Sequence, residues 1–128
     1  MATAPSGLAI LLWATGADRP ALCAAPFMYA SAACALELAV EIHFAAASVQ
    51  LLVPGVAESI HPGHAAQRSL AEFMQDAHEA GARFLACSAA LHEHGLERHH
   101  LSAWLHGTAG ATSFVARTVD TQWRTLVF

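Results

Sequence analysis

Cys87 is the residue of this sequence that is best placed for chemistry. It ends a short apolar run, Arg83–Cys87, and precedes a segment of helical spacing, Ala89–His94. A thiol between a strand and a helix would face the unpaired backbone amides at the helix start, beginning with Ser88. The partial positive charge of those amides favours a thiolate, which is the form of cysteine that attacks and carries sulfur. We therefore expect Cys87 to be a nucleophile, with Ser88 as an assisting neighbour.

A structural interpretation of Cys87 competes with this one. Free cysteine is among the most buried residue types and packs as a small apolar side chain. From position alone, a thiol that only closes the strand explains Cys87 as well as a reactive thiol does.

The other two cysteines have different predicted roles. Cys23 comes just after the first expected strand, on the sheet edge where Cys87 should also lie, so it could resolve a persulfide or sulfenate on Cys87. Cys34 falls on the apolar stripe of a helix and is predicted to pack in the core. Three cysteines without CxxC spacing predict neither a disulfide framework nor a four-thiolate zinc site.

Nine histidines are many for this length, and two of them, His92 and His94, follow Cys87 closely. A protonated imidazole would favour the thiolate, and neutral imidazoles bind zinc or copper. However, side chains two apart on a helix diverge, and no HExxH motif is present, so a solvated polar face explains this pair better. His43 alternates with apolar residues and is predicted to be packed or hydrogen-bonded, with a place in the cleft as the alternative.

Secondary-structure elements must position these side chains. Along the chain, short apolar runs alternate with segments of helical spacing, which predicts a layered α/β domain. We expect a three-layer sandwich whose mostly parallel five-stranded sheet has helices on both faces, forming a single domain over residues 1–128. The expected strands are Leu8–Trp13, Ala39–Phe44, Arg83–Cys87, Leu126–Phe128 and a fifth between Leu105 and Gly110.

The expected helices differ in how clearly the sequence marks them. The clearest has a capping box, Ser69 with Glu72, and ends at Gly81. The others are a helix starting close to Pro26, a short one over Ala89–His94, helical spacing from Leu101 to Gly107, and a last helix over Ala111–Val119. The segment Pro54–Arg68 is a long loop of the kind that forms lids or subunit contacts.

Composition excludes several classes of function. The net charge is −4 and all six cationic side chains are scattered arginines, so nucleic acid binding is not expected. The longest apolar region, Ala21–Val53, is interrupted by charges and Pro26, so we expect core rather than a membrane span. No GxGxxG, P-loop or GxSxG motif is present, and no organic cofactor is implied.

The same composition predicts location and assembly. No basic start precedes the first apolar run, so no secretory signal is predicted, and we expect a cytoplasmic protein with reduced thiols. Charged residues make up only 12% of the chain. A lone subunit with so few charges would expose apolar surface, which predicts a homo-oligomer.

The segment Phe84-Leu85-Ala86-Cys87-Ser88-Ala89-Ala90-Leu91, followed by Gly95-Leu96, resembles the DsrE/DsrF-like family of sulfur-relay proteins. The family's pattern is an apolar strand, a cysteine, small residues and then a glycine one short helix later. The other expected strands and helices fall in the family's order, so the resemblance covers nearly the whole chain.

The resemblance implies a layered α/β fold, assembly into trimers or hexamers, and a cysteine that takes persulfide sulfur from one carrier protein and passes it to another. That role falls on Cys87. Two alternatives remain: a non-catalytic oligomeric binding or assembly protein of the same fold, and a histidine-based metal binder. One departure is the segment Ala46-Ala47-Ser48-Val49, because relatives often have a glycine there; we therefore do not expect a close backbone approach to a ligand at this point.

Overall fold

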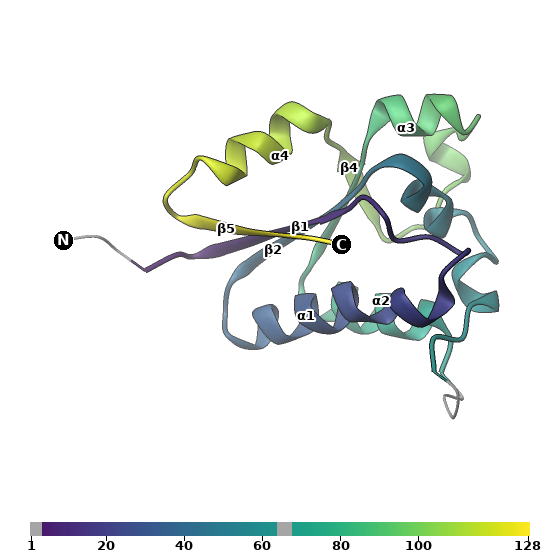
Figure 1. Cartoon of the computed structure of the whole chain (residues 1–128), viewed down its shortest axis with the longest axis horizontal. Coiled ribbons are helices and arrows are strands. Elements are labelled where there is room, and N and C mark those ends of the chain that lie inside the picture. Colours follow the sequence, from purple (N-terminus) through teal and green to yellow (C-terminus); the bar gives the residue numbers. More distant parts are fainter. Residues whose placement is uncertain (1–3, 64–67) are drawn as a thin grey trace.

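The computed structural model describes residues 4–63 and 68–128, which form a five-stranded sheet with helices on both faces (Figure 1). All strands are parallel and lie in the order β4-β3-β2-β1-β5. The strands are β1 (Gly7–Leu12), β2 (Ala39–Phe44), β3 (Arg83–Ala86), β4 (Leu105–Thr108) and β5 (Trp123–Val127). The helices are α1 (Ala24–Ala35), α2 (Leu70–Ala80), α3 (Ser88–Glu93) and α4 (Ala111–Thr118), and 3-10 turns cover Pro20–Leu22, Ala46–Leu52, Ala57–Ser59 and Arg98–His100.

The direction of the connections decides which face α1, α2 and α4 cover (Figure 1). The chain steps from β1 to β2 to β3 in one direction, and α1 and α2 lie below the sheet in Figure 1. It then crosses back from β4 to β5 on the far side of β1, and α4 lies above the sheet. Because crossovers between parallel strands are right-handed, reversing the direction puts the helix on the opposite face. The predicted three-layer sandwich is therefore confirmed, and its sheet is parallel throughout.

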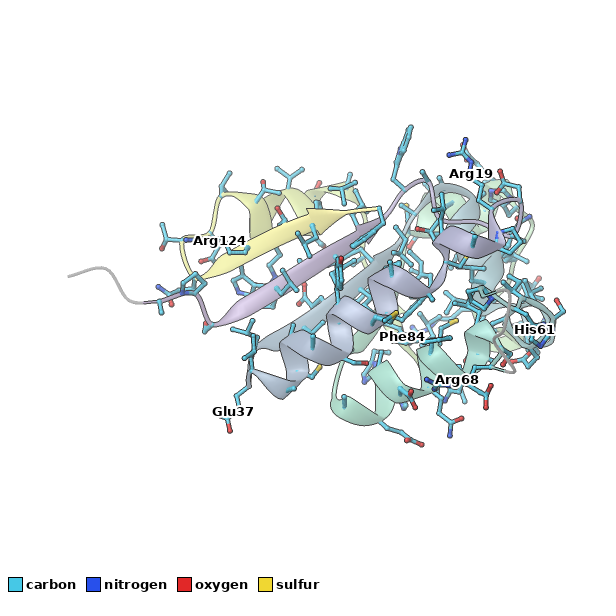
Figure 2. All side chains as sticks on the ribbon, turned by 60° about the horizontal axis from the view of Figure 1, so that its bottom comes forward. Arg19, Glu37, His61, Arg68, Phe84 and Arg124 are labelled. Carbon is cyan, nitrogen blue, oxygen red and sulfur yellow. The ribbon has the colours of Figure 1, made fainter. Side chains whose placement is uncertain are left out.

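The main core lies between the sheet and the two lower helices. Three phenylalanines from α1, β2 and β3, namely Phe27, Phe44 and Phe84, are fully buried, with ring centroids 5.4–6.1 Å apart. Such offset and tilted ring packing adds to the hydrophobic stabilisation of burying each side chain. Figure 2 shows Phe84 among the side chains between the sheet and these helices. This face is mostly apolar, although His78 of α2 packs edge to face on Phe84 with ring centroids 5.9 Å apart.

The helix with the clearest sequence signals forms as predicted. Ser69 and Glu72 make the capping box, in which the Ser69 hydroxyl accepts from the Glu72 amide and the Glu72 carboxylate accepts from the Ser69 amide. Gly81 ends α2 with φ 115°, a left-handed conformation that glycine adopts without steric cost.

The helical spacing predicted from Leu101 to Gly107 is wrong, because the chain turns at Ala103 and then forms β4. The alternative prediction of a fifth strand between Leu105 and Gly110 is confirmed. Three apolar residues carried the helical pattern, and pairing of Leu105–Thr108 with the free edge of β3 outweighs it.

The last strand begins three residues before the predicted Leu126. Trp123 opens β5 opposite Gly7, and a Cβ on Gly7 would lie 2.5 Å from the indole. Gly7 therefore makes room for Trp123, and both strands extend beyond their apolar runs for that reason.

The predicted loop Pro54–Arg68 is partly ordered by packing. Ala57 and Ile60 are buried, and the Ile60 carbonyl accepts from the Leu70 amide at the start of α2. Residues 64–67 of this segment lie outside the described residues. No helix of the described chain is long and apolar enough to span a lipid bilayer.

The turn after α1 gives a stability prediction. Glu37 has φ 64°, a left-handed conformation that costs an ordinary residue about 1 kcal/mol, and its side chain points into solvent (Figure 2). Glu37→Gly should therefore raise the free energy of unfolding by roughly 0.5–1 kcal/mol in chemical denaturation. Glu37→Ala is the matched control, because it removes the carboxylate and keeps the strain. Equal stability of the two variants would show that the backbone conformation is not the cause.

Candidate functional site

A pocket of about 230 Å³ opens at the carboxyl edge of the sheet, where parallel α/β sheets place their ligands. The ends of β1 and β2, the residues directly after β3 and β4, and the first turns of α4 form its walls. Its lining residues are Leu11, Trp13, His43, Phe44, Ala45, Cys87, Ala109, Gly110, Ala111, Phe114 and Val115. Of these, His43 and Cys87 alone have titratable side chains, so any acid, base or nucleophile in the wall is one of these two.

Backbone hydrogen bonds fix Cys87 in this wall. Its amide donates to the Phe44 carbonyl at 2.9 Å, which ties it to the end of β2. Its carbonyl accepts from the Leu91 amide at 3.0 Å, which starts α3. The Cys87 side chain is half-buried, so the thiol lies in the pocket wall and is partly exposed to solvent.

The expected contact between the Cys87 thiol and the first amides of α3 is not formed. Cys87 is the N-cap residue of α3, with φ −70° and ψ 119°, but within the described chain its side chain makes no capping hydrogen bond. Ser88, the first residue of α3, is exposed and does not line the pocket. A six-residue helix also has a weak dipole, so Cys87 needs another group to favour its thiolate.

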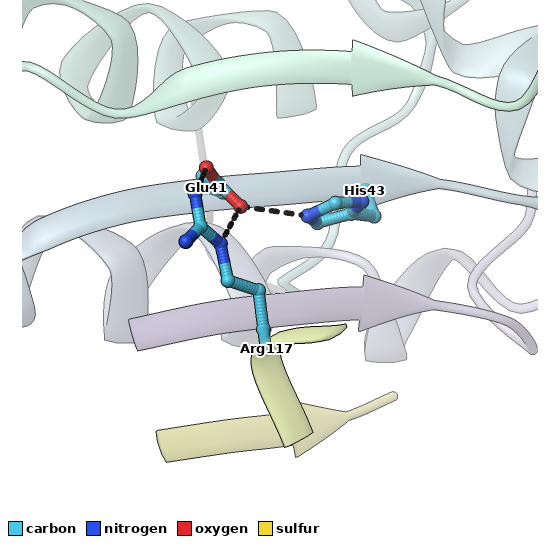
Figure 3. Close-up of polar contacts among 3 residues, drawn as sticks. All are labelled: Glu41, His43 and Arg117. Carbon is cyan, nitrogen blue, oxygen red and sulfur yellow. Dashed lines mark hydrogen bonds and ion pairs between the residues drawn. The ribbon is translucent and has the colours of Figure 1, made fainter. Parts of the chain in front are cut away.

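The buried Glu41 and His43 form a polar network with the partly exposed Arg117 beside the pocket (Figure 3). The Nε2 atom of His43 lies 3.0 Å from Oε1 of Glu41. Arg117 donates to both carboxylate oxygens, from Nε to Oε1 at 3.0 Å and from Nη2 to Oε2 at 2.6 Å. Such a two-point pairing is the strongest common geometry between guanidinium and carboxylate.

Apolar and aromatic contacts hold the network in place. The Arg117 guanidinium lies 3.8 Å from the centroid of the Trp123 ring, which suits its planar charge. Phe114 meets the His43 ring edge to face, with centroids 5.3 Å apart. Glu41 and His43 are only 6% and 3% exposed, so solvent screens this network little.

The pairing decides the charge on Glu41. Burial alone would raise the pKa of Glu41, but the hydrogen bonds and positive charge of Arg117, with the bond to His43, lower it below its usual value. The bond to Glu41 also raises the pKa of Arg117. Both side chains are therefore ionised at neutral pH, and Glu41 can only accept hydrogen bonds.

One nitrogen of His43 remains without a partner. Among the described residues, no hydrogen-bonding group reaches Nδ1, although this atom is buried. Nδ1 of His78 is also buried and without a partner among the described residues, but it is not in the pocket wall. Buried polar atoms are satisfied in most proteins, so an unsatisfied one in a pocket that also contains a cysteine requires an explanation.

The structure does not bring Cys23 to the pocket. This thiol is fully buried in the core and donates to the Gly16 and Arg19 carbonyls at 3.2 and 3.4 Å. Burial, together with the charge of Asp18, raises the pKa of Cys23, which disfavours its thiolate. Cys34 packs against the core from α1, and burial raises its pKa as well. The geometry therefore does not support Cys23 as a resolving thiol.

The histidines after Cys87 also lie outside the pocket wall. His92 is exposed on α3, and Nδ1 of His94 lies 3.3 Å from the Gln50 amide nitrogen. A different group, Glu97, His99 and His100, places its potential ligand atoms within 4.8 Å of one another, but all three side chains are exposed.

The turn after β2 adopts a backbone conformation that favours glycine, although this chain has an alanine there. Ala46 has φ 50°, a left-handed conformation that favours glycine.

Sequence reasoning missed Glu41 and Arg117. The available signal was the placement of two polar residues, Glu41 and His43, two apart on a strand predicted inside a doubly covered sheet. Side chains two apart share a face, so the two should have been expected to pair under a helix. Nothing in the sequence identified Arg117 as the cation, because it is 76 residues from Glu41.

Comparisons with known proteins agree with this architecture. Residues 9–128 match the model of the DsrE/DsrF-like family. The structure resembles the ychN protein from E. coli, with a TM-score of 0.66 and 13% identity over 96% of this chain and 99% of that one. It also resembles MTH1491 from Methanobacterium thermoautotrophicum, a protein of unknown function, with a TM-score of 0.65 and 15% identity over 94% and 97% of the two chains.

No curated protein sequence matches the chain. The two structural likenesses share the fold, and the family match spans the strands and helices that build the Cys87 pocket. The chain belongs to the DsrE/DsrF-like family.

Proposed function

We propose that this protein carries sulfane sulfur as a persulfide on Cys87. The observation that carries the proposal is the half-buried Cys87 thiol in an apolar pocket that it shares with His43. Membership of a family of the sulfur-relay type supports it. The proposed role is that of a carrier that uses no organic cofactor.

The transfer step needs a donor persulfide and no outside oxidant. The Cys87 thiolate attacks the outer sulfur of a donor R–S–SH, and a new S–S bond forms as the donor's S–S bond breaks. The donor leaves as a thiolate, R–S⁻, and takes up the proton that Cys87 released. The products are Cys87–S–SH and R–SH, so no electrons are gained or lost overall.

The apolar walls suit a persulfide in transit. Leu11 and Phe114 present hydrocarbon, which keeps water and soluble thiols away from the bound outer sulfur. Trp13 is 66% exposed and Val115 is 55% exposed at the same pocket, so an associating protein could cover this apolar opening. The proposed acceptor or donor is accordingly another sulfur-carrier protein.

We also propose that this chain self-associates. Self-association is compatible with the sulfur carrier and is the main feature expected of the alternative, a non-catalytic assembly protein of the same fold. Val119 at the end of α4 and Val127 on β5 are 77% and 62% exposed, and the Trp13 amide donates to the carbonyl of Phe128, the neighbour of Val127. β5 is an edge strand with these apolar side chains close to it, which is a surface that isolated soluble domains avoid. We propose that copies of this chain cover it in a homo-oligomer.

Incubation with a low-molecular-weight persulfide should add one sulfur atom to the peptide that contains Cys87. Mass spectrometry of the digested protein measures the adduct before and after treatment with a reductant, which should remove it. Cys87→Ser should abolish the adduct, because the nucleophile is lost, and Cys34→Ser should leave it unchanged. An adduct spread equally over Cys34 and Cys87, or none at all, would contradict the proposal.

Light scattering after size exclusion should give a mass that is a multiple of the 13.5 kDa subunit. The double variant Val119→Lys with Val127→Lys should shift that mass toward one subunit, because burying two ammonium groups opposes association. Ala80→Lys, which adds a charge at the end of α2, is the matched control. A wild-type protein of one subunit mass at high concentration would refute self-association.

A further inference from the structure

We propose that His43 is the general base for Cys87, accepting the thiol proton at Nδ1, and that Glu41 is the positioning residue that keeps Nδ1 free. This inference rests on the proposed function, because it explains how Cys87 becomes the attacking thiolate. It assigns the buried network of Figure 3 a chemical purpose rather than a purely structural one.

The pairing with Glu41 fixes which nitrogen of His43 carries the proton. Oε1 of Glu41 already accepts from Arg117 and lies 3.0 Å from Nε2 of His43. An ionised carboxylate has no hydrogen to donate, so Nε2 must be the donor. In a neutral imidazole the other nitrogen, Nδ1, then has a free lone pair and is the basic position.

The surroundings hold the ring in this orientation. Phe114 packs edge to face against the ring from α4, and Figure 3 shows the Nε2 edge directed along β2 toward Glu41. Because the two nitrogens lie on different edges of the ring, Nδ1 faces away from the carboxylate. Nδ1 is buried and has no hydrogen-bond partner among the described residues, so its lone pair is free to accept a proton from a thiol.

Strand register brings Cys87 to the same face. His43 pairs with Leu85 on β3, and paired residues of neighbouring strands project to the same side of a sheet. Cys87 follows Leu85 by two residues, and its backbone is still extended, so its side chain shares that face. The thiol therefore lies one step beyond His43, and both line the pocket.

The elements packed around His43 contribute few charges. β1 and β3 place Leu11 and Leu85 beside it, and α4 contributes Phe114 and Arg117. Among the described residues, the charged groups of the network around the ring are Glu41 and Arg117, and the Cys87 thiol lines the same pocket as the ring. Glu41 stays ionised because of Arg117, so an imidazolium formed at His43 would be stabilised by the carboxylate beside it.

The proton path is balanced over the whole transfer. The Cys87 S–H bond breaks as the Nδ1–H bond forms, which gives a thiolate and an imidazolium. The thiolate takes the outer sulfur of the donor R–S–SH, and the imidazolium returns its proton to the departing R–S⁻. The assembly follows the general pattern of a nucleophile, a base and a carboxylate that orients the base.

The test is the pH dependence of Cys87 alkylation by iodoacetamide, followed on the Cys87 peptide by mass spectrometry. In the wild-type protein the rate should already approach its maximum near about pH 7, because His43 supplies the base. In His43→Gln it should fall at that pH by about tenfold or more and rise with pH as for an ordinary thiol. Near about pH 10, where hydroxide ionises the thiol, the two proteins should react at similar rates.

A second variant covers the case in which His43→Gln does not fold. Glu41→Gln keeps the shape of the side chain but can donate a hydrogen bond, so His43 loses its fixed tautomer and its stabilised imidazolium. It should slow alkylation at about pH 7 and converge with the wild type at about pH 10. Cys34→Ser is the control and should leave the Cys87 profile unchanged.

The two proposals fail in different ways. If both variants keep the wild-type pH profile, His43 is not the base, even if Cys87 still takes up sulfur. If the profile depends on His43 but no persulfide forms on Cys87, the base is real and the sulfur-carrying function is wrong. A rate that stays low at every pH would show a structural role for His43 and would also overturn the inference.

Discussion

The Glu41–Arg117 ion pair is the interaction on which the site depends. A carboxylate on the central strand of the sheet would lose its hydration without compensation, and breaking a buried pair by removing one partner is strongly destabilising. Arg117, on α4, neutralises that charge and donates two hydrogen bonds to the carboxylate. The ring of Trp123, on β5, packs against the Arg117 guanidinium. The pair therefore joins three separate elements, β2, α4 and β5, on the face of the sheet opposite the phenylalanine core. Because α4 also forms a wall of the pocket, the position of this one helix determines both the ionisation of Glu41 and the shape of the pocket.

The two faces of the sheet have different tasks. The lower face is mostly apolar and packs against α1 and α2 around three aromatic rings, so hydrophobic burial supplies most of its stability. The upper face is covered by α4 over Phe114 and Arg117, and it contains the acid, the imidazole and the thiol. This division lets a small domain keep buried polar chemistry, because the cost of burying it is offset by an independent hydrophobic core.

Much of the architecture follows from local signals in the sequence. The capping box at Ser69 and the apolar runs of β1 to β3 specify their elements within a few residues, and Cys87 is placed at the pocket by the strand that precedes it. What the sequence could not specify depends on contacts between distant residues. β4 forms because β3 offers a free edge, which outweighs a helical pattern of three apolar residues. The cation for Glu41 comes from a helix far along the chain, and any of six arginines could have supplied it. His43 was predicted to be packed or hydrogen-bonded. Only the structure shows that Nε2 pairs with Glu41, which leaves Nδ1 as the basic nitrogen.

The pairing of β1 with β5 has a consequence for synthesis. These strands come from opposite ends of the described chain, yet they are direct neighbours, with Gly7 opposite Trp123. During translation the segments that form β1, β2 and β3 leave the ribosome before those that form α4 and β5. Until α4 is made, the upper face of the sheet has no α4 packed on it, and Glu41 lacks its partner Arg117. Parallel pairing over such sequence distances is slow to form. The side of the domain that carries the Cys87 pocket is therefore the last part to assemble, and a nascent chain at that stage exposes apolar surface to which chaperones bind.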